Sequence, residues 1–320
     1  MTRLRCAILD DYYDTALTLA DWPALADRVD ATVFTHPFAS EQDVQSALVD
    51  FDIICAMRER TAFPRSLIEA LPKLKLLLTS GMRNAAIDME AAKARNVVVC
   101  GTQYGRDPTA HLAIGLMLEL TRKIGQENAR MHAGEPWQKL GGVEIEGKTL
   151  GLIGLGKLGT KVAGLGKAFG MNPIAWSPNL TPERCAAAGV GYATKEELFS
   201  TADIISIHVV LSERSRGLVG RNDLARMKPS AYIVNTSRGP IIDEAALLET
   251  LRQKKIAGAA LDVFSVEPLP TDHPFRKLDN LVLTPHLGYV TEESFRAHYG
   301  QMVECIAAYV AGSEPPRRLV

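Results

Sequence analysis

Short apolar runs alternate with amphipathic stretches along most of the chain. The runs are short enough for buried β-strands, and the stretches between them repeat their apolar residues at helical spacing. The strands predicted in the first half are residues 4–9, 31–35, 52–57, 74–79 and 97–100, with helices such as 41–49 and 64–71 between them. Alternation of this kind predicts a parallel sheet whose strands are joined by right-handed helical crossovers.

The same alternation starts again after a long helical stretch, about residues 108–131, whose length suits a connector between domains. Asp107 and Pro108 are placed to cap this stretch and to occupy its first turn. The strands predicted in the second half are 150–153, 174–177, 204–208, 232–235, 257–262 and 281–284. A last amphipathic helix, about 292–311, needs a surface to cover, and we expect it to pack back on the N-terminal domain. The pattern therefore predicts an α/β protein with two doubly wound parallel-sheet domains.

Size and charge agree with a two-domain globular protein. A chain of 320 residues exceeds the usual size of a single core. A net charge of -1 gives no electrostatic reason to bind nucleic acid or an anionic membrane. No apolar run approaches the roughly 20 residues that cross a bilayer. These observations favour a partner that is a small molecule.

The cysteines are dispersed and odd in number. None of the five forms a Cys-x-x-Cys pair, and several lie inside apolar strands; they are Cys6, Cys55, Cys100, Cys185 and Cys305. The N-terminus runs directly into the first predicted strand without a cleavable signal pattern. We therefore expect reduced core thiols, a cytoplasmic location and no metal site.

A Gly-rich loop, Gly154-Leu-Gly156-Lys-Leu-Gly159, follows the first strand of the second half and opens a helix that runs to about residue 169. In this context Gly154 permits a tight turn, Gly156 lets the backbone approach a pyrophosphate, and Gly159 lets helix and strand pack closely. The helix N-terminus, with its free N–H groups, favours an anion there. The alternative is a plain glycine turn, but the strand–loop–helix context favours dinucleotide binding.

The choice between NAD and NADP depends on the end of the next strand. An NAD site of this type usually has Asp or Glu there to bind the ribose hydroxyls. Ser177 occupies this position, and the nearest cation that could hold a 2′-phosphate is Arg184. Both cofactors stay open, with NAD preferred because no cation follows the strand directly.

Three phrases in the last third carry the remaining chemistry. They are Asn-Thr-Ser-Arg238-Gly-Pro, Asp262-Val-Phe-Ser-Val-Glu267-Pro and Thr-Pro-His286-Leu-Gly, and each lies at or just after a predicted strand, where α/β folds place ligand-binding groups. A guanidinium can bind a carboxylate and a carbonyl through its planar fork of donors. An imidazole can protonate a keto oxygen, and a carboxylate beside it fixes its orientation and favours its charged form.

With these phrases the chain resembles the D-isomer-specific 2-hydroxyacid dehydrogenases, a family that includes D-3-phosphoglycerate dehydrogenases. The resemblance implies a Rossmann cofactor domain, residues 105–288, inserted into a flavodoxin-like substrate domain made of residues 1–104 and 289–320. It also implies an active site in the cleft between the domains and a homodimer formed through the cofactor domain. Glu267 distinguishes the chain from the related formate dehydrogenases, which have a glutamine there.

The resemblance assigns a role to each matching residue. Arg238 binds the substrate, His286 is the acid and base, and Glu267 orients His286, while Asp262 contacts the nicotinamide carboxamide. The full set of cofactor positions is Gly154, Gly156, Lys157, Leu158, Gly159, Ser177, Val209, Thr236, Ser237, Asp262 and Gly288. The substrate positions are Arg58, Ser80, Gly81, Met82 and Arg238.

The first half offers weaker indications. Thr79-Ser80-Gly81-Met82 resembles the loop that receives the substrate carboxylate through backbone N–H groups, and Arg58 could meet a further anionic group or be an ordinary solvated arginine. Two positions depart from the family pattern. His111 stands where the family often has a glutamate, and we expect a structural role for it. Shortly after His208 the family commonly has a proline, whereas this chain has the pair Val209-Val210.

The function predicted is interconversion of a small 2-keto acid and its D-2-hydroxy acid by hydride transfer with NAD(P). The alternative is an NAD(H)-sensing protein of the same fold, similar to the corepressors that keep the same three residues. Turnover of 2-keto acids separates the two hypotheses.

Overall fold

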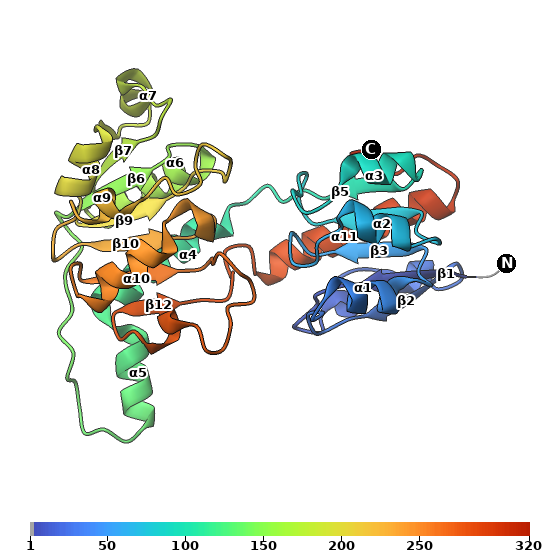
Figure 1. Cartoon of the computed structure of the whole chain (residues 1–320), viewed down its shortest axis with the longest axis horizontal. Coiled ribbons are helices and arrows are strands. Elements are labelled where there is room, and N and C mark those ends of the chain that lie inside the picture. Colours follow the sequence, from blue (N-terminus) through green and yellow to red (C-terminus); the bar gives the residue numbers. More distant parts are fainter. Residues whose placement is uncertain (1–2) are drawn as a thin grey trace. The chain divides into compact units, whose positions relative to one another are not determined.

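The computed structural model describes residues 3–320, which fold into two units. The first unit comprises the residues up to Arg106 together with Val290–Val320, and the second comprises Asp107–Tyr289 (Figure 1). The chain thus leaves the first unit, completes the second and returns.

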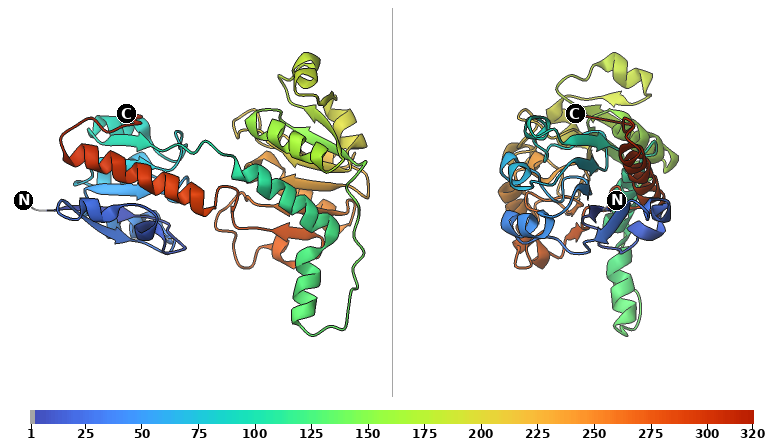
Figure 2. Two further views of the ribbon diagram at one scale, coloured as in Figure 1. Left: turned by 180° about the vertical axis from the view of Figure 1, so that it is seen from behind. Right: turned by 90° about the vertical axis from the view of Figure 1, so that its right-hand side faces the viewer.

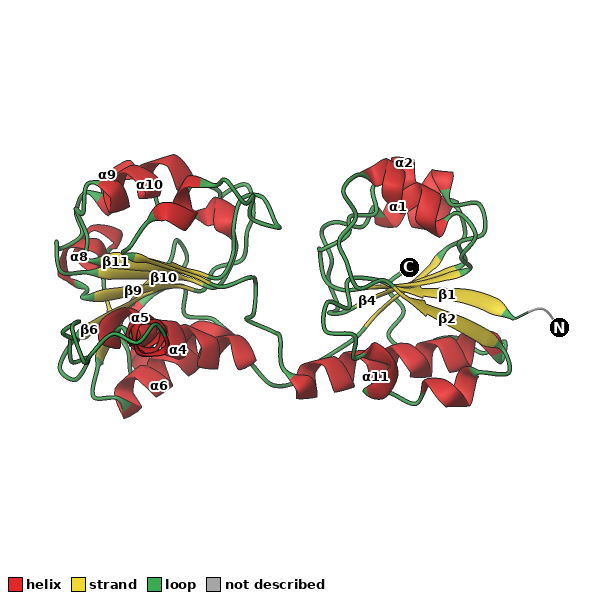
Figure 3. Ribbon diagram, turned by 90° about the horizontal axis from the view of Figure 1, so that it is seen from below, coloured by secondary structure: helices red, strands yellow, loops and turns green. Residues whose placement is uncertain are grey.

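The first unit is a five-stranded parallel sheet in the order β2-β1-β3-β4-β5. Its strands are β1 (Leu4–Ile8), β2 (Val29–Val33), β3 (Ile53–Ala56), β4 (Leu76–Thr79) and β5 (Val98–Gly101). Its helices are η1 (Ala16–Thr18), η2 (Trp22–Leu25), α1 (Glu41–Leu48), α2 (Arg65–Ala70), α3 (Met89–Ala94) and α11 (Glu292–Val310). Helices α1 and α2 cover one face of the sheet and α11 lies on the other (Figure 3). The strand order is the flavodoxin-like one that was predicted.

The second unit is a seven-stranded parallel sheet in the order β12-β11-β10-β9-β6-β7-β8, a Rossmann arrangement with β6 as its first strand. Its strands are β6 (Thr149–Ile153), β7 (Asn172–Trp176), β8 (Gly191–Tyr192), β9 (Ile204–Ile207), β10 (Tyr232–Asn235), β11 (Gly258–Leu261) and β12 (Leu281–Leu283). Its helices are α4 (Pro108–Arg122), α5 (Ile124–His132), α6 (Lys157–Ala168), α7 (Pro182–Ala187), α8 (Lys195–Thr201), α9 (Arg221–Leu224), η3 (Gly239–Ile241), α10 (Glu244–Arg252) and η4 (Pro274–Lys277).

Apolar side chains cover both faces of the second sheet. Leu198, Leu224 and Leu247 belong to one buried cluster, on the α8–α10 side, and Met117 and Val162 belong to the other, on the side of α4 and α6 (Figure 3). A sheet covered on both faces has strands that are apolar at successive positions, which explains the short continuous runs in the sequence.

The strand register places the functional segments at one edge of this sheet. Ile153 pairs with Ile207, Ile207 with Asn235, and Asn235 with Leu261. The residues that follow these four strands therefore emerge side by side at the carboxyl edge, where open α/β sheets bind their ligands.

One local prediction was wrong, a second was confirmed in position only, and one short strand was not predicted. The helix expected over 108–131 is two helices, because Lys123 has a left-handed backbone (φ 57°) that ends α4 before α5 begins. Asp107 is the N-cap residue of α4 and Pro108 lies in the first turn, as predicted, but the Asp107 side chain makes no capping hydrogen bond; its carboxylate instead pairs with Lys157 Nζ at 2.8 Å. The short strand β8 was missed, since two residues carry no detectable periodicity.

Candidate active site

An imidazole and a carboxylate from different segments meet in the second unit. His286 Nδ1 lies 2.6 Å from Glu267 Oε2, and the other carboxylate oxygen accepts the backbone N–H of Phe264 at 2.8 Å. Burial by itself would raise the pKa of Glu267, but the hydrogen bond and charge of His286 hold that pKa below its usual value. The carboxylate therefore stays ionised near neutral pH, and its contact with His286 uses Nδ1 and not Nε2.

The turn that carries His286 is held by Asp262. His286 has a left-handed backbone (φ 55°). Asp262 Oδ1 accepts from the Thr284 hydroxyl at 2.6 Å and from Leu287 N at 2.7 Å, and Oδ2 accepts from Gly288 N at 2.8 Å. Burial raises the pKa of Asp262, and these three donors oppose the rise. Asp262 thus fixes the backbone on both sides of the imidazole.

Arg238 follows β10 in a turn whose backbone is closely packed. Asn235 Nδ2 donates to Arg238 O at 2.9 Å, and a side chain on Gly239 would come within 2.1 Å of the Phe264 carbonyl carbon. Only glycine therefore lets this turn approach the segment that leads to Glu267. The guanidinium Nη1 donates to Ser237 O at 2.8 Å, and its charge helps to lower the pKa of Glu267. The structure brings all three predicted catalytic residues into one neighbourhood.

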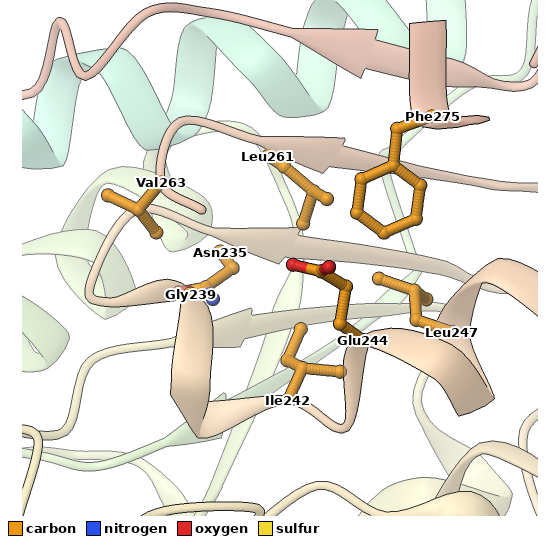
Figure 4. Close-up of a pocket in the computed structure, with 8 residues that line it drawn as sticks. All are labelled: Asn235, Gly239, Ile242, Glu244, Leu247, Leu261, Val263 and Phe275. Atoms are coloured by element: carbon orange, nitrogen blue, oxygen red, sulfur yellow. The ribbon is translucent and has the colours of Figure 1, made fainter. Parts of the chain in front are cut away.

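A small cavity is lined in part by Asn235 and Gly239 of this turn, and Arg238 is not among its lining residues (Figure 4). Most of its lining is apolar, and the Glu244 carboxylate beside it lies 3.3 Å from His273 Nε2. The lining residues are Asn235, Gly239, Ile242, Glu244, Leu247, Leu261, Val263 and Phe275. The cavity is a packing feature between α10 and the sheet, because it adjoins the backbone of the Arg238 turn and none of the three catalytic side chains.

Each glycine of the Gly-rich loop has a distinct environment. Gly154 has φ 101°, and a side chain on Gly159 would come within 2.1 Å of Gly154 O. Gly156 differs, since a side chain there would meet no other part of the protein within 4 Å. The first and third glycines thus serve the turn and the helix–strand packing, and the open space at the second fits an approaching pyrophosphate.

Two buried polar atoms at the neighbouring strand ends have no hydrogen-bond partner among residues 3–320. They are His208 Nδ1, after β9, and Thr236 Oγ1, after β10. Burial lowers the pKa of His208 to about 4, so its ring is neutral, and Nε2 lies 2.9 Å from Ser206 Oγ. Buried polar atoms normally have partners, so the lack of one here fits the binding of a polar ligand at this edge.

The other predicted cofactor residues have mainly structural contacts. Val209 packs against Gly154, the Ser237 hydroxyl donates to Ile207 O at 2.7 Å, and Leu158 joins the apolar cluster of α4 and α6. Ser177 directly follows β7, as predicted, and Arg184 is exposed on α7.

The predicted substrate residues of the first unit also lie together. Arg58 N donates to Ser80 Oγ at 2.8 Å, and the Arg58 guanidinium lies against Gly81, so close that a side chain at Gly81 would overlap Nη1. The N–H of Gly81 donates to Thr102 Oγ1 at 3.1 Å, which occupies it internally. The N–H of Met82 forms no hydrogen bond within the described part of the chain. Of these two backbone N–H groups, Gly81 N is therefore occupied within residues 3–320 and Met82 N is not.

Two contributions were not foreseen from the sequence. Asp262 accepts hydrogen bonds from the turn that carries His286, up to 26 positions further along the chain. Thr102 accepts the N–H of Gly81 across a separation of 21 residues. His111 is exposed on α4. In residues 3–320 no three His, Cys, Asp or Glu side chains are grouped to hold a metal ion. No helix in the same range has the length and apolar character needed to cross a membrane.

Comparison with known proteins gives a consistent picture. Residues 114–288 match the family model of the D-isomer specific 2-hydroxyacid dehydrogenase NAD binding domain. The chain is 40% identical over 262 residues to D-3-phosphoglycerate dehydrogenase of Methanocaldococcus jannaschii, covering 81% of this chain and 49% of that protein. It is 39% identical over 278 residues to hydroxypyruvate reductase of Thermotoga maritima, covering 85% of this chain and 89% of that protein.

Solved structures agree with these matches. A phosphoglycerate oxidoreductase from Vibrio cholerae superposes with a TM-score of 0.92 at 31% identity, covering 97% of this chain and all of that one. The chain spans about half the length of the phosphoglycerate dehydrogenase that it matches and most of the hydroxypyruvate reductase. The match of residues 114–288 to the family model, together with relatives about 40% identical over most of the chain, shows that the chain belongs to the D-isomer-specific 2-hydroxyacid dehydrogenase family.

Proposed function

We propose that the protein reduces a small 2-keto acid to its D-2-hydroxy acid with NADH, and catalyses the reverse reaction with NAD. The observation that carries this proposal is the 2.6 Å contact between His286 Nδ1 and Glu267 Oε2, with Arg238 in the same neighbourhood. A histidine side chain is suited to acid–base catalysis when one ring nitrogen contacts a carboxylate and the other is available to a substrate.

The proposed roles follow from the geometry. Arg238 binds the substrate carboxylate, and His286 Nε2 gives its proton to the keto oxygen as a hydride from the nicotinamide reaches the carbonyl carbon. Bound NADH would supply the hydride, so that keto acid, NADH and the proton from His286 give the hydroxy acid and NAD, and the imidazole then takes up a proton from solvent. Glu267 keeps the ring oriented and Asp262 keeps its backbone in place.

The residues at the carboxyl edge of the seven-stranded sheet fit the cofactor. We propose that the pyrophosphate binds over Gly156 at the start of α6, where nothing of the protein would be displaced. The unpartnered atoms of His208 and Thr236 are candidates to bind the nicotinamide half. With Ser177 at the end of β7, the site could accept NADP as well as NAD, because there is no carboxylate at this position to repel a 2′-phosphate.

The first unit is proposed to set the preference for one keto acid over another. Arg58 and the segment Ser80–Met82 lie together at the ends of β3 and β4, and a cation beside the backbone N–H of Met82 favours an anionic substrate. Hydroxypyruvate is the acid in the name of the Thermotoga maritima relative, glyoxylate is the acid in the name of a 37% identical glyoxylate reductase of Thermococcus litoralis, and phosphohydroxypyruvate is the keto acid that corresponds to 3-phosphoglycerate.

The enzyme is favoured over an NAD(H)-sensing protein because the relatives named above are dehydrogenases and reductases. The test is oxidation of NADH, and in parallel of NADPH, with glyoxylate, hydroxypyruvate, pyruvate and phosphohydroxypyruvate. We expect turnover of at least one acid, and Arg238→Ala should lower kcat/KM by about a hundredfold or more, the cost of losing a paired charge in a binding site.

Arg252→Ala is the matched control, since Arg252 is exposed on α10 and makes no contact with the site. Its kcat/KM should equal that of the unmodified protein. Tight binding of NADH without turnover of any acid would overturn the proposal and support the sensor instead.

A further inference from the structure

A buried histidine on the last helix contacts the segment proposed to bind substrate in the first unit. His298 lies on α11 and is 5% exposed. Its Nδ1 lies 2.7 Å from Thr102 Oγ1, a contact between residues 196 positions apart. The ring also packs beside Tyr104, with the centroids 6.3 Å apart. None of the roles assigned above uses this imidazole.

Thr102 connects His298 to Gly81. The hydroxyl of Thr102 accepts the N–H of Gly81 at 3.1 Å and lies 3.3 Å from Thr79 O, while Thr102 N donates to Gly81 O at 3.3 Å. A hydroxyl has one proton to donate and two lone pairs. All three contacts of Oγ1 are satisfied together when the hydroxyl donates to Thr79 O and His298 Nδ1–H donates to the hydroxyl. Thr102 therefore holds Gly81 from both sides, and His298 holds Thr102.

The imidazole suits this task because it is neutral. Burial and the nearby charge of Arg58 lower the pKa of His298 to about 4, so the ring carries a single N–H near neutral pH. The same helix fixes the next residue of the chain as well. Gln301 Oε1 accepts from Gln103 N at 2.8 Å, and Gln301 Nε2 donates to Gln103 O at 2.7 Å. Two side chains of α11 thus bind two successive residues after β5.

The segment that Thr102 holds includes Gly81, which contacts the Arg58 side chain. Gly81 has φ 97°, and the Arg58 guanidinium lies directly against it. A shift of Gly81 would therefore move both the free N–H of Met82 and the surface on which the guanidinium rests. Binding of a small acid is sensitive to such shifts, since displacements of about 1 Å in a positioning group can cost a hundredfold.

We propose that His298 is a positioning residue for substrate: through Thr102 it holds the Thr79–Met82 segment and the Arg58 guanidinium in the geometry that receives the keto acid. This inference rests on the proposed function, because it presumes that the segment binds the substrate. On this proposal, a residue near the end of the chain contributes to substrate affinity. It should not contribute to NADH binding, because the proposed cofactor residues belong to the other unit.

The test compares variants that remove or keep the hydrogen bond. His298→Leu keeps much of the volume without a polar atom, and Thr102→Val keeps the shape of threonine without its hydroxyl. We expect each to raise KM for the keto acid about tenfold, the effect of roughly 1.4 kcal/mol, with a smaller change in kcat and an unchanged Kd for NADH. The double variant should be no worse than either single variant, since both break the same contact.

Conservative variants and a control distinguish positioning from simple packing. Thr102→Ser and His298→Asn keep polar atoms near those positions and should restore most of the affinity. His36→Leu is the matched control, because His36 is an exposed histidine of the same unit whose Nδ1 lies 2.9 Å from the hydroxyl of Thr35. Its KM should not change.

Several outcomes would overturn the proposal. An unchanged KM in a folded His298→Leu variant would do so, as would additive effects in the double variant, failure of the conservative variants to restore affinity, or an equal loss of NADH binding. If the protein turns over none of the acids and Arg238→Ala changes nothing, the proposed function is wrong, and this inference with it. If the protein turns over an acid and substitution of His298 leaves KM for that acid unchanged, this inference alone is wrong.

Discussion

At the scale of single residues, the position of the proposed acid and base, His286, depends on two neighbouring carboxylates. Glu267 orients the ring of His286, and Asp262 accepts three hydrogen bonds that shape its turn. The grouping of Arg238, Glu267 and His286 could be predicted from the sequence, because each follows a strand whose carboxyl end lies at the same edge of the sheet; their catalytic roles stay a prediction. The supporting role of Asp262 could not be predicted, since it depends on which backbone N–H groups come within 3 Å of its carboxylate after folding.

Glu267→Gln is the residue-scale prediction. The amide can no longer carry the charge that holds the imidazole, so kcat/KM should fall about a hundredfold, part of what acid–base catalysis contributes. The pKa of Glu267 is lowered in the folded protein, so its ionised form stabilises the fold above the pKa of the unfolded chain. That contribution is lost as the pH falls through the folded-state pKa.

Urea unfolding of the unmodified protein and the variant at several pH values between 7 and 3 measures this effect. The variant should be the less stable protein at pH 7, and the difference in the free energy of unfolding should shrink toward pH 3. A difference that stays constant with pH would contradict the assigned ion pair.

At the scale of elements, glycine decides how closely β6 and α6 approach. Gly159, in α6, sits where any side chain would come within 2.1 Å of Gly154 O, whereas Gly164 in the same helix faces open space. The sequence predicted the turn and the close packing because the spacing of the three glycines determines both. It did not predict the break at Lys123, since nothing in the apolar spacing of 108–131 marks a residue that adopts φ 57°.

Gly159→Ala and Gly164→Ala make a matched pair for this element. The first should weaken NADH binding at least tenfold and lower the melting temperature, because a backbone oxygen cannot yield as a flexible side chain can. The second should keep the affinity for NADH and gain slightly in stability, since alanine favours a helix over glycine by up to about 1 kcal/mol. Fluorescence titration with NADH and thermal unfolding measure both. Equal behaviour of the two variants would contradict the packing role of Gly159.

At the scale of the whole molecule, α5 is an element without a core of its own. None of its residues is buried, and it extends away from the rest of the second unit (Figure 2). Apolar side chains on it and on the segment that follows are more than half exposed: Ile124 is 56% exposed, Met131 52% and Trp137 68%. A helix of nine residues is not stable by itself in water, and exposed apolar groups of this kind mark interaction surfaces.

We propose that these side chains are covered by a second copy of the chain, giving the homodimer that the family resemblance implies. Met131→Ser combined with Trp137→Ser should shift the protein from dimer toward monomer in sedimentation equilibrium, because the loss of two apolar contacts costs a few kcal/mol of association free energy. Phe169→Ser is the control: Phe169 is 43% exposed at the end of α6, so the substitution removes a comparable exposed apolar group from another surface. If the double variant stays a dimer, or if the control dissociates equally, the interface lies elsewhere. If the unmodified protein sediments as a monomer, no second copy covers the apolar side chains of α5 and the proposal is wrong.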